Sequence, residues 1–294
     1  MTGVQTCALP ICTGSMQIIK QKTKTLVTKD NGRSSDAVSP NFLYGCLGGC
    51  MKSYCYVSRY NNDRVYVNEN IDDILHSIHT WVEKKPWEKI PNQVDDKYYC
   101  IDIGCSTDVP LMGKYYDWQK VFDFFNSHEK LKSTFATKYP TRMKEYKIDP
   151  QKNRIRVSLM PQVYSSVLEP NTDKIEDRIS SIKKLQQQFE LHINFSPIIY
   201  HNNWLQEYEK LFQQLEGIDF KSECIFLTYN EIQYKRNSEQ INEMCWKPDI
   251  QEKKNSSYAD NNIRYQWQLK NKMIQQFKEV YNNYFNTKTI RYIF

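Results

Sequence analysis

Residues 155–198 are IRVSLMPQVYSSVLEPNTDKIEDRISSIKKLQQQFELHINFSPI, and this stretch decides the fold. It begins with an apolar run of strand length at 155–160 and ends with another at 191–198. Between the two runs, apolar residues recur at helical spacing, on Ile175, Ile179, Ile182, Leu185 and Phe189. A strand, a crossover helix and a second strand in this order are typical of a parallel strand pair.

The same alternation extends in both directions, from about residue 70 to residue 230. We expect further strands at 42–45, 98–103, 134–138 and 224–228, and helices at 71–82, 118–125 and 204–215. Asn70 stands where it would cap the first helix. Six strand-helix units predict an α/β fold, a partial six-stranded (β/α)6 TIM-like barrel, and active sites in such barrels lie at the C-terminal ends of the strands.

Three regions are expected along the chain. Residues 16–230 form the barrel, and residues 231–294 form a helical and β extension, a candidate nucleic-acid contact, with a helix at 269–284 and a last strand at 289–294. Residues 1–15 are predicted to be a non-native leader, because the segment from Met1 to Cys12 resembles translated adapter sequence. We therefore leave Cys7 and Cys12 out of the site.

Composition limits the class of protein. In 294 residues, 40% are hydrophobic and 14% aromatic, which is enough for a large core and excludes a disordered chain. No apolar run is long enough for a membrane span and no secretory signal is visible, so we expect a cytoplasmic protein with no membrane partner. The net charge of +6 permits a polyanionic partner without requiring one. Nine cysteines in such a chain indicate metal or redox chemistry.

The most informative segment is Cys46-Leu-Gly-Gly-Cys50-Met-Lys-Ser-Tyr-Cys55. Three thiolates in a glycine-containing loop can hold three irons of a [4Fe–4S] cluster and leave the fourth iron open. Structural zinc is an alternative, but it needs four ligands, and the nearest histidines, His76 and His79, lie on a predicted helix more than twenty residues away. Buried structural cysteines are a second alternative.

Five further regions resemble the spore photoproduct lyase family of radical S-adenosylmethionine (SAM) enzymes. They are Tyr54-Cys55-Tyr56, Cys105-Ser106-Thr107-Asp108, Thr137-Lys138-Tyr139, Val157-Ser158-Leu159 with Leu168-Glu169-Pro170, and Pro197-Ile198-Ile199-Tyr200-His201. They occur in the family's order over about residues 42–230. The resemblance implies a [4Fe–4S] cluster on Cys46, Cys50 and Cys55, where SAM is cleaved reductively to a 5′-deoxyadenosyl radical.

The resemblance also implies catalytic roles for three residues. Cys105 would give a hydrogen atom to the product thymine radical, and Tyr54 and Tyr56 would lie near the radical path. Read without the family, Cys105 could be a small buried residue, as free cysteines often are. The two tyrosines are most simply packing residues among the 21 tyrosines of the chain.

Three residues are implied as SAM contacts. They are Ser106, where many radical SAM proteins carry a Gly-Gly-Glu segment, Lys138 and Ser158. Lys138 ends an apolar strand, where a charge is costly unless it faces solvent or a ligand carboxylate. Ser158 is nearly as readily explained as a hydrogen-bonded hydroxyl of the core.

The implied function is repair of a methylene-bridged thymine dimer in DNA, with a reduced flavodoxin or ferredoxin-type protein as electron donor. Two departures put the substrate in question: the second cysteine gap has four residues instead of two, and Ser106-Thr107 reverses the family's Thr-Ser order. A radical SAM enzyme acting on RNA or a peptide is therefore an alternative. A nucleic-acid-binding protein with a structural cluster is another, although such a cluster would more naturally have four cysteine ligands.

Overall fold

The fold is built on one long, curled sheet. The computed structural model describes residues 17–48, 54–55, 64–254 and 262–294. The strand order of the main sheet is β14-β10-β9-β8-β7-β6-β3-β2, and every neighbouring pair is parallel except β2 with β3. The bounds are β2 Lys29–Asp30, β3 Ala37–Val38, β6 Tyr99–Asp102, β7 Leu131–Thr137, β8 Asn153–Leu159, β9 Glu190–Ile198, β10 Lys221–Phe226 and β14 Ile290–Ile293.

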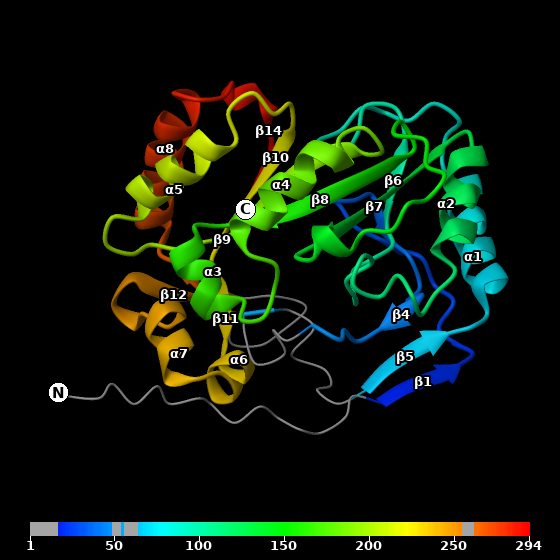
Figure 1. Cartoon of the computed structure of the whole chain (residues 1–294), viewed down its shortest axis with the longest axis horizontal. Coiled ribbons are helices and arrows are strands. Elements are labelled where there is room, and N and C mark those ends of the chain that lie inside the picture. Colours follow the sequence, from blue (N-terminus) through cyan, green and yellow to red (C-terminus); the bar gives the residue numbers. More distant parts are fainter. Residues whose placement is uncertain (1–16, 49–53, 56–63, 255–261) are drawn as a thin grey trace.

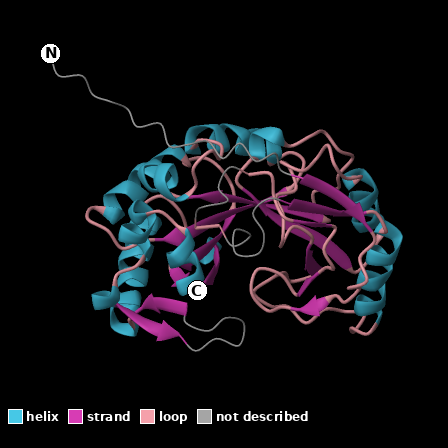
Figure 2. Cartoon of the chain, turned by 90° about the horizontal axis from the view of Figure 1, so that it is seen from below, coloured by secondary structure: helices cyan, strands magenta, loops and turns pink. Residues whose placement is uncertain are grey.

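Helices cover the outer side of this sheet, which curves as an open arch (Figures 1 and 2). The bounds are α1 Ile71–Glu83, α2 Trp118–Ser127, α3 Gln162–Leu168, α4 Ile175–Leu185, α5 Trp204–Gln214 and α8 Trp267–Asn282. The predicted partial α/β barrel is confirmed, as are its long helices to within a few residues. The short helix α3, between β8 and α4, was not predicted.

Alternation along the strands separates the core from the inner face. On β8, Ile155, Val157 and Leu159 are fully buried in the hydrophobic core, whereas Arg156 and Ser158 line a cavity on the other face. Successive side chains of a strand point to opposite faces. The apolar strand pattern therefore packs on the helices and leaves the inner face of the arch for polar chemistry.

The predicted first barrel strand at 42–45 is wrong in its placement. Leu43–Tyr44 (β4) pairs antiparallel with β5 (Arg64–Asn68), which pairs parallel with β1 (Gln17–Gln21), and these form a separate three-stranded sheet. The strand beside β6 is instead β3, which ends just before Pro40. Because proline has no N–H to donate to a ladder, the main sheet stops there and the chain turns away.

Asn70 does not cap α1 as expected, although it occupies the N-cap position. Its side-chain oxygen accepts the backbone N–H of Thr23 (2.9 Å), and its amide donates to Asp73 (2.9 Å). The side chain thus fastens the start of α1 to the segment that follows β1.

The C-terminal part combines a small sheet with the last strand of the main one. The antiparallel sheet has the order β11 (Thr228–Asn230), β13 (Asn262–Tyr265) and β12 (Gln251–Lys254), with α6 (Glu231–Arg236) and α7 (Glu239–Cys245) between the strands in sequence. The predicted last strand is confirmed as β14, which pairs with β10. The boundary at residue 230 stays a prediction. Short 3-10 helices occur at Pro140–Arg142, Pro248–Ile250 and Thr287–Thr289. Within the described ranges, every helix is too short or too polar to cross a membrane.

Candidate active site

One cavity of about 1150 Å³ collects the predicted site residues. Its lining includes residues at the C-terminal ends of strands β6 to β9, where the fold predicts a site. All seven predicted site residues that the structure describes line it: Cys46, Tyr54, Cys55, Cys105, Ser106, Lys138 and Ser158. The other two, Cys50 and Tyr56, lie outside the described residues.

Gly45 attaches the cysteine loop to the end of β6. Its N–H donates to the carbonyl oxygen of Ser106 (3.0 Å), so the first cysteine starts beside the predicted cofactor contacts. Its φ is 103°, and a Cβ there would lie 2.6 Å from the carbonyl oxygen of Arg64. Only glycine adopts this conformation readily at so close an approach.

Gly48 leaves space beside the first thiol. Its N–H donates to the Sγ of Cys46 (3.3 Å). A Cβ at Gly48 would lie 3.2 Å from that sulfur and 2.8 Å from the hydroxyl of Tyr139. The absence of a side chain at Gly48 therefore leaves a space beside the sulfur of Cys46. Such a space fits a bulky group bound to that sulfur.

The environment of Cys46 disfavours a free thiolate. Burial raises the pKa of its thiol to about 12, and negative charge on Asp108 and Cys55 adds to the effect. Bound metal reverses this balance, because a coordinating thiol is deprotonated. In the part of the chain that the structure describes, Cys46 and Cys55 share no third His, Cys, Asp or Glu as a common ligand.

Asp108 fixes the loop after β6 to the end of β7. Its buried carboxylate accepts the hydroxyl of Thr137 (2.9 Å) and the backbone N–H of Lys138 (2.9 Å). Burial raises the pKa of this carboxyl to about 6, although the hydrogen bonds oppose the rise. The same carboxylate accepts a longer hydrogen bond from the backbone N–H of Leu111 (3.3 Å), so Asp108 also caps the turn that follows it.

Lys138 lies at the cavity with a buried carboxylate beside it. Its Nζ is 3.3 Å from Glu169, and Glu169 is 2.9 Å from the Nη1 of Arg178. Burial alone would raise the pKa of Glu169, but the two cations outweigh it and hold the pKa below its ordinary value. The charge of Lys138 at this strand end is thus compensated, and its predicted contact with SAM stays a prediction.

Among the described residues of the cavity lining, two buried polar atoms have no hydrogen-bond partner. They are the Oγ1 of Thr107 and the Oδ1 of Asn194, in residues that are 7% and 8% exposed. Leaving such atoms unpaired costs free energy, so a partner is expected from a bound ligand. Sequence reasoning missed both. For Thr107 a signal existed, since it occupies the third position of the Cys-Thr-Ser-Asp motif and keeps a hydroxyl there.

Cys105 and Tyr54 differ in their surroundings. Cys105 is exposed and lines the cavity, so it is not packed in the core. Tyr54 is half-buried, stacks on Tyr229 with the ring centroids 6.4 Å apart, and accepts the side-chain amide of Gln233 at its carbonyl oxygen (3.1 Å). Burial raises the pKa of the Tyr54 phenol to about 12. Tyr54 thus joins the cavity to the C-terminal part of the chain and stays protonated at neutral pH.

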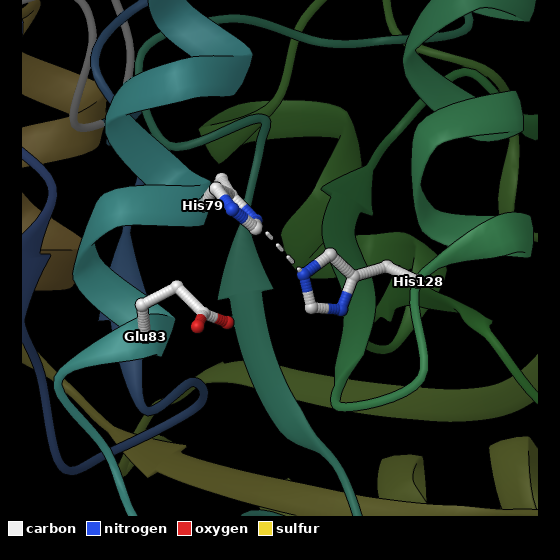
Figure 3. A group of neighbouring side chains, drawn as sticks. All are labelled: His79, Glu83 and His128. Atoms are coloured by element: carbon white, nitrogen blue, oxygen red, sulfur yellow. Dashed lines mark hydrogen bonds between the residues drawn. The ribbon is translucent and has the colours of Figure 1, made fainter.

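A second group of potential metal ligands lies outside the cavity lining. His79 and Glu83 on α1 and His128 after α2 place their ligand atoms within 4.8 Å of one another (Figure 3). The Nδ1 of His128 accepts the backbone N–H of Lys130 (3.2 Å), and its Nε2 is 3.4 Å from the Nδ1 of His79. Because the Nδ1 of His128 accepts a hydrogen bond, the proton of the neutral ring is on Nε2, which donates a hydrogen bond to the Nδ1 of His79. This hydrogen bond accounts for the pair without an ion.

Comparison with known proteins decides the family. The sequence profile of the spore photoproduct lyase family matches residues 17–294. The chain belongs to the spore photoproduct lyase family. The resemblance seen in the motifs is thus confirmed by nearly the whole length of the sequence.

Curated members of the spore photoproduct lyase family are distant relatives. The spore photoproduct lyase of Clostridium acetobutylicum is 27% identical over 183 residues, which are 60% of this chain and 52% of the relative. That of Bacillus subtilis is 22% identical over 201 residues, 66% of this chain and 55% of the relative. The chain spans about half the length of the curated relatives it matches.

Solved structures of the spore photoproduct lyase family share the fold. A spore photoproduct lyase complexed with dinucleoside spore photoproduct superposes with a TM-score of 0.79 at 19% identity, over 94% of this chain and 81% of that one. A variant with bound AdoMet, which is SAM, and dinucleoside spore photoproduct gives a TM-score of 0.76 at 18% identity over the same shares.

Proposed function

We propose that this chain is a radical SAM lyase that repairs a methylene-bridged thymine dimer in DNA. The observation that carries the proposal is the convergence of seven predicted site residues on one cavity at the strand ends. These residues come from four separate segments of the sequence, and their meeting in one cavity supports a shared site. The relatives named above bear the same activity in their names, and the two solved structures described above hold dinucleoside spore photoproduct.

Cys46, Cys50 and Cys55 would hold the [4Fe–4S] cluster. The buried thiol of Cys46 and the cradle at Gly48 fit such a group. When bound, the cluster supplies an electron that cleaves SAM to a 5′-deoxyadenosyl radical. A reduced flavodoxin or ferredoxin-type protein is the electron donor that we predict.

SAM would be held by polar groups of the inner face. Ser106, Lys138 and Ser158 line the cavity as the family resemblance implies. To these we add Thr107 and Asn194, whose unpaired buried oxygens are available to accept or share a hydrogen bond from the cofactor.

Cys105 would complete the reaction by giving up a hydrogen atom. Its S–H bond breaks, a C–H bond forms on the product thymine radical, and a thiyl radical remains on sulfur. Tyr54 or Tyr56 would then give the hydrogen atom of its hydroxyl to the thiyl radical, and the resulting tyrosyl radical would take a hydrogen atom from 5′-deoxyadenosine, which regenerates the 5′-deoxyadenosyl radical. The exposure of Cys105 in the cavity supports this role, because a donor must approach the substrate closely.

The test is anaerobic reconstitution followed by an assay of SAM cleavage with and without lesion-bearing DNA. We expect about four irons per chain, and cleavage that yields two thymines from the lesion. Cys46→Ala should abolish the cluster, whereas Cys105→Ala should keep the cluster and SAM cleavage and change the product. A stoichiometric zinc content would contradict the proposal. SAM cleavage without any reaction on thymine lesions would favour the RNA or peptide alternative.

A further inference from the structure

Three cations surround one aromatic ring beside the cavity. The Nζ of Lys254 lies 3.8 Å from the ring centroid of Phe294, the Cζ of Arg33 lies 4.2 Å from it, and the Nζ of Lys270 lies 5.2 Å from it. Arg33, Lys254 and Phe294 line the cavity. The four residues come from the loop before β3, the end of β12, helix α8 and the end of the chain after β14, which Figure 2 marks on the inner side of the arch.

This cation cluster has no acidic partner among the residues that the structure describes. The side chains of Arg33, Lys254 and Lys270 make neither an ion pair nor a hydrogen bond there, whereas the neighbouring Arg264 is paired with Glu252 (3.0 Å). The ring attracts each cation, but the cations repel one another at these distances. Partial burial, and then the charges of Arg33, Arg264 and Lys270, lower the pKa of Lys254 to about 8. An anion placed among the three would remove this repulsion.

The rest of the cavity indicates which anion this is. Beside charged residues such as Asp108, Lys138 and Arg156, its lining presents a thiol, hydroxyls and an amide, namely Cys105, Ser106, Thr107, Ser158 and Asn194. An uncharged group, such as a nucleobase, suits such a lining, and a cationic site beside it suits the charged backbone of the same molecule. A nucleic-acid strand carries uncharged bases and charged phosphates in one molecule.

We infer that Arg33, Lys254 and Lys270 bind a backbone phosphate of the DNA strand whose thymines enter the cavity. The inference rests on the proposed function for the identity of the strand. The phosphate contact itself requires no turnover, so it can be measured on undamaged DNA.

The experiment measures binding of a short single-stranded oligodeoxynucleotide with adjacent thymines to the anaerobically reconstituted full chain. Lys254→Gln should weaken binding roughly tenfold at low salt, as expected for loss of a charge-assisted contact. It should also make the slope of log K against log[salt] shallower by about 0.7 to 1. Lys254→Arg keeps the charge and should restore the wild-type slope.

Lys253→Gln is the matched control. Lys253 is exposed and precedes Lys254 on β12, so its side chain points to the opposite face of the strand. We expect it to keep the slope of the wild-type protein. An equal loss in Lys253→Gln and Lys254→Gln would overturn the inference, because it would show only a general effect of net charge.

A neutral phosphate analogue identifies the contact directly. Oligonucleotides that carry one methylphosphonate at each position in turn should reveal a position where wild-type binding falls and Lys254→Gln shows no further fall. An equal loss of affinity in both proteins at every position would contradict the phosphate contact.

Two other results would change the assignment. Weaker SAM binding by Lys254→Gln in the absence of DNA would assign the cation cluster to the carboxylate of the cofactor. Tighter binding of RNA than of DNA of the same sequence would contradict the DNA assignment. If one methylphosphonate position and Lys254→Gln remove the same contact but the protein does not repair the lesion, only the proposed function is refuted and the phosphate contact stands.

Discussion

Gly48 shows how one residue without a side chain can define a site. The space that its missing Cβ leaves lies between the Sγ of Cys46 and the hydroxyl of Tyr139. The sequence places a glycine next to the cysteines but does not reveal what it faces. Only the fold brings Tyr139, from the end of β7, to this loop.

Gly48→Ala should therefore reduce cluster binding. The added methyl group would meet the Tyr139 hydroxyl at 2.8 Å and must displace it or the cysteine loop, at a cost of about 1–3 kcal/mol. We expect a lower iron content after reconstitution and a lower Tm. Combining it with Tyr139→Phe removes the clashing oxygen and should recover part of the iron.

Gly32→Ala is the control for this variant. A Cβ at Gly32 has no atom within 4 Å, so iron content and Tm should equal those of the wild type. If Gly48→Ala also binds a full complement of iron, the space beside Cys46 is not required for the cluster.

The residues that sequence reasoning missed share a physical property. Thr107 and Asn194 are ordinary polar residues in the sequence, and their distinguishing feature is the absence of a partner for a buried oxygen. That feature depends on every neighbour in space. By contrast, the place of Cys46, Lys138 and Ser158 in one cavity could be predicted, because each belongs to a local motif of the sequence.

Helices and strands could be predicted where the spacing of their apolar residues continues over many neighbouring positions. The spacing of Trp118, Val121, Phe122 and Phe125 fixes α2, and all four side chains are fully buried. Strand β3 has only two residues, so no periodicity reveals it. The small sheet of β11, β13 and β12 was also missed, because β11 pairs with a strand more than thirty residues later and the pairing leaves no local signal.

The N-terminal ends of β7, β8 and β9 carry a buried charge network that no sequence motif predicted. Lys132 and Arg154 share the carboxylates of Asp95 and Glu190 at 2.6–3.1 Å. His192, fully buried, lies 2.9 Å from Glu190 through its Nε2. Burial, and then Arg154, lower the pKa of His192 to about 3, so the ring is neutral and donates to the carboxylate.

The stability of the protein should therefore fall in mild acid through His192. The unfolded chain binds a proton at His192 below about pH 6.5, whereas the folded protein does so only near pH 3, so unfolding takes up a proton between these values. We expect the free energy of unfolding to drop by about 2 kcal/mol from pH 7 to pH 5 on this account. Urea unfolding at several pH values measures it.

His192→Gln should flatten that dependence, because an amide can donate to Glu190 but does not titrate. His76→Gln, on the exposed side of α1, should leave the pH dependence as it is in the wild type. An unchanged slope in His192→Gln would show that other groups cause the loss in acid.

The arch keeps its apolar core between sheet and helices, and in the described part of the chain it leaves buried oxygens of Thr107 and Asn194 unpaired at the cavity. Thr107 illustrates the consequence, since its buried hydroxyl has no partner in the ranges that the structure describes. Without ligand such a group contributes little or nothing to stability, and a bound cofactor that pairs with it stabilises the entire fold by mass action.

Thr107→Val should separate these two effects. Without SAM, we expect its free energy of unfolding to equal or slightly exceed that of the wild type, because no hydrogen bond is lost. SAM at a concentration of about 100 times Kd should stabilise the wild type by about 2.7 kcal/mol, and the variant by about 1 kcal/mol less at the same concentration. Anaerobic thermal unfolding with and without SAM measures both quantities.

Thr137→Val is the contrasting variant. The hydroxyl of Thr137 donates a hydrogen bond to Asp108 (2.9 Å), so its loss should destabilise the protein even without SAM. If SAM stabilised Thr107→Val as much as the wild type, the hydroxyl would have no part in holding the cofactor, and Ser106 alone would remain as the hydroxyl contact of this loop.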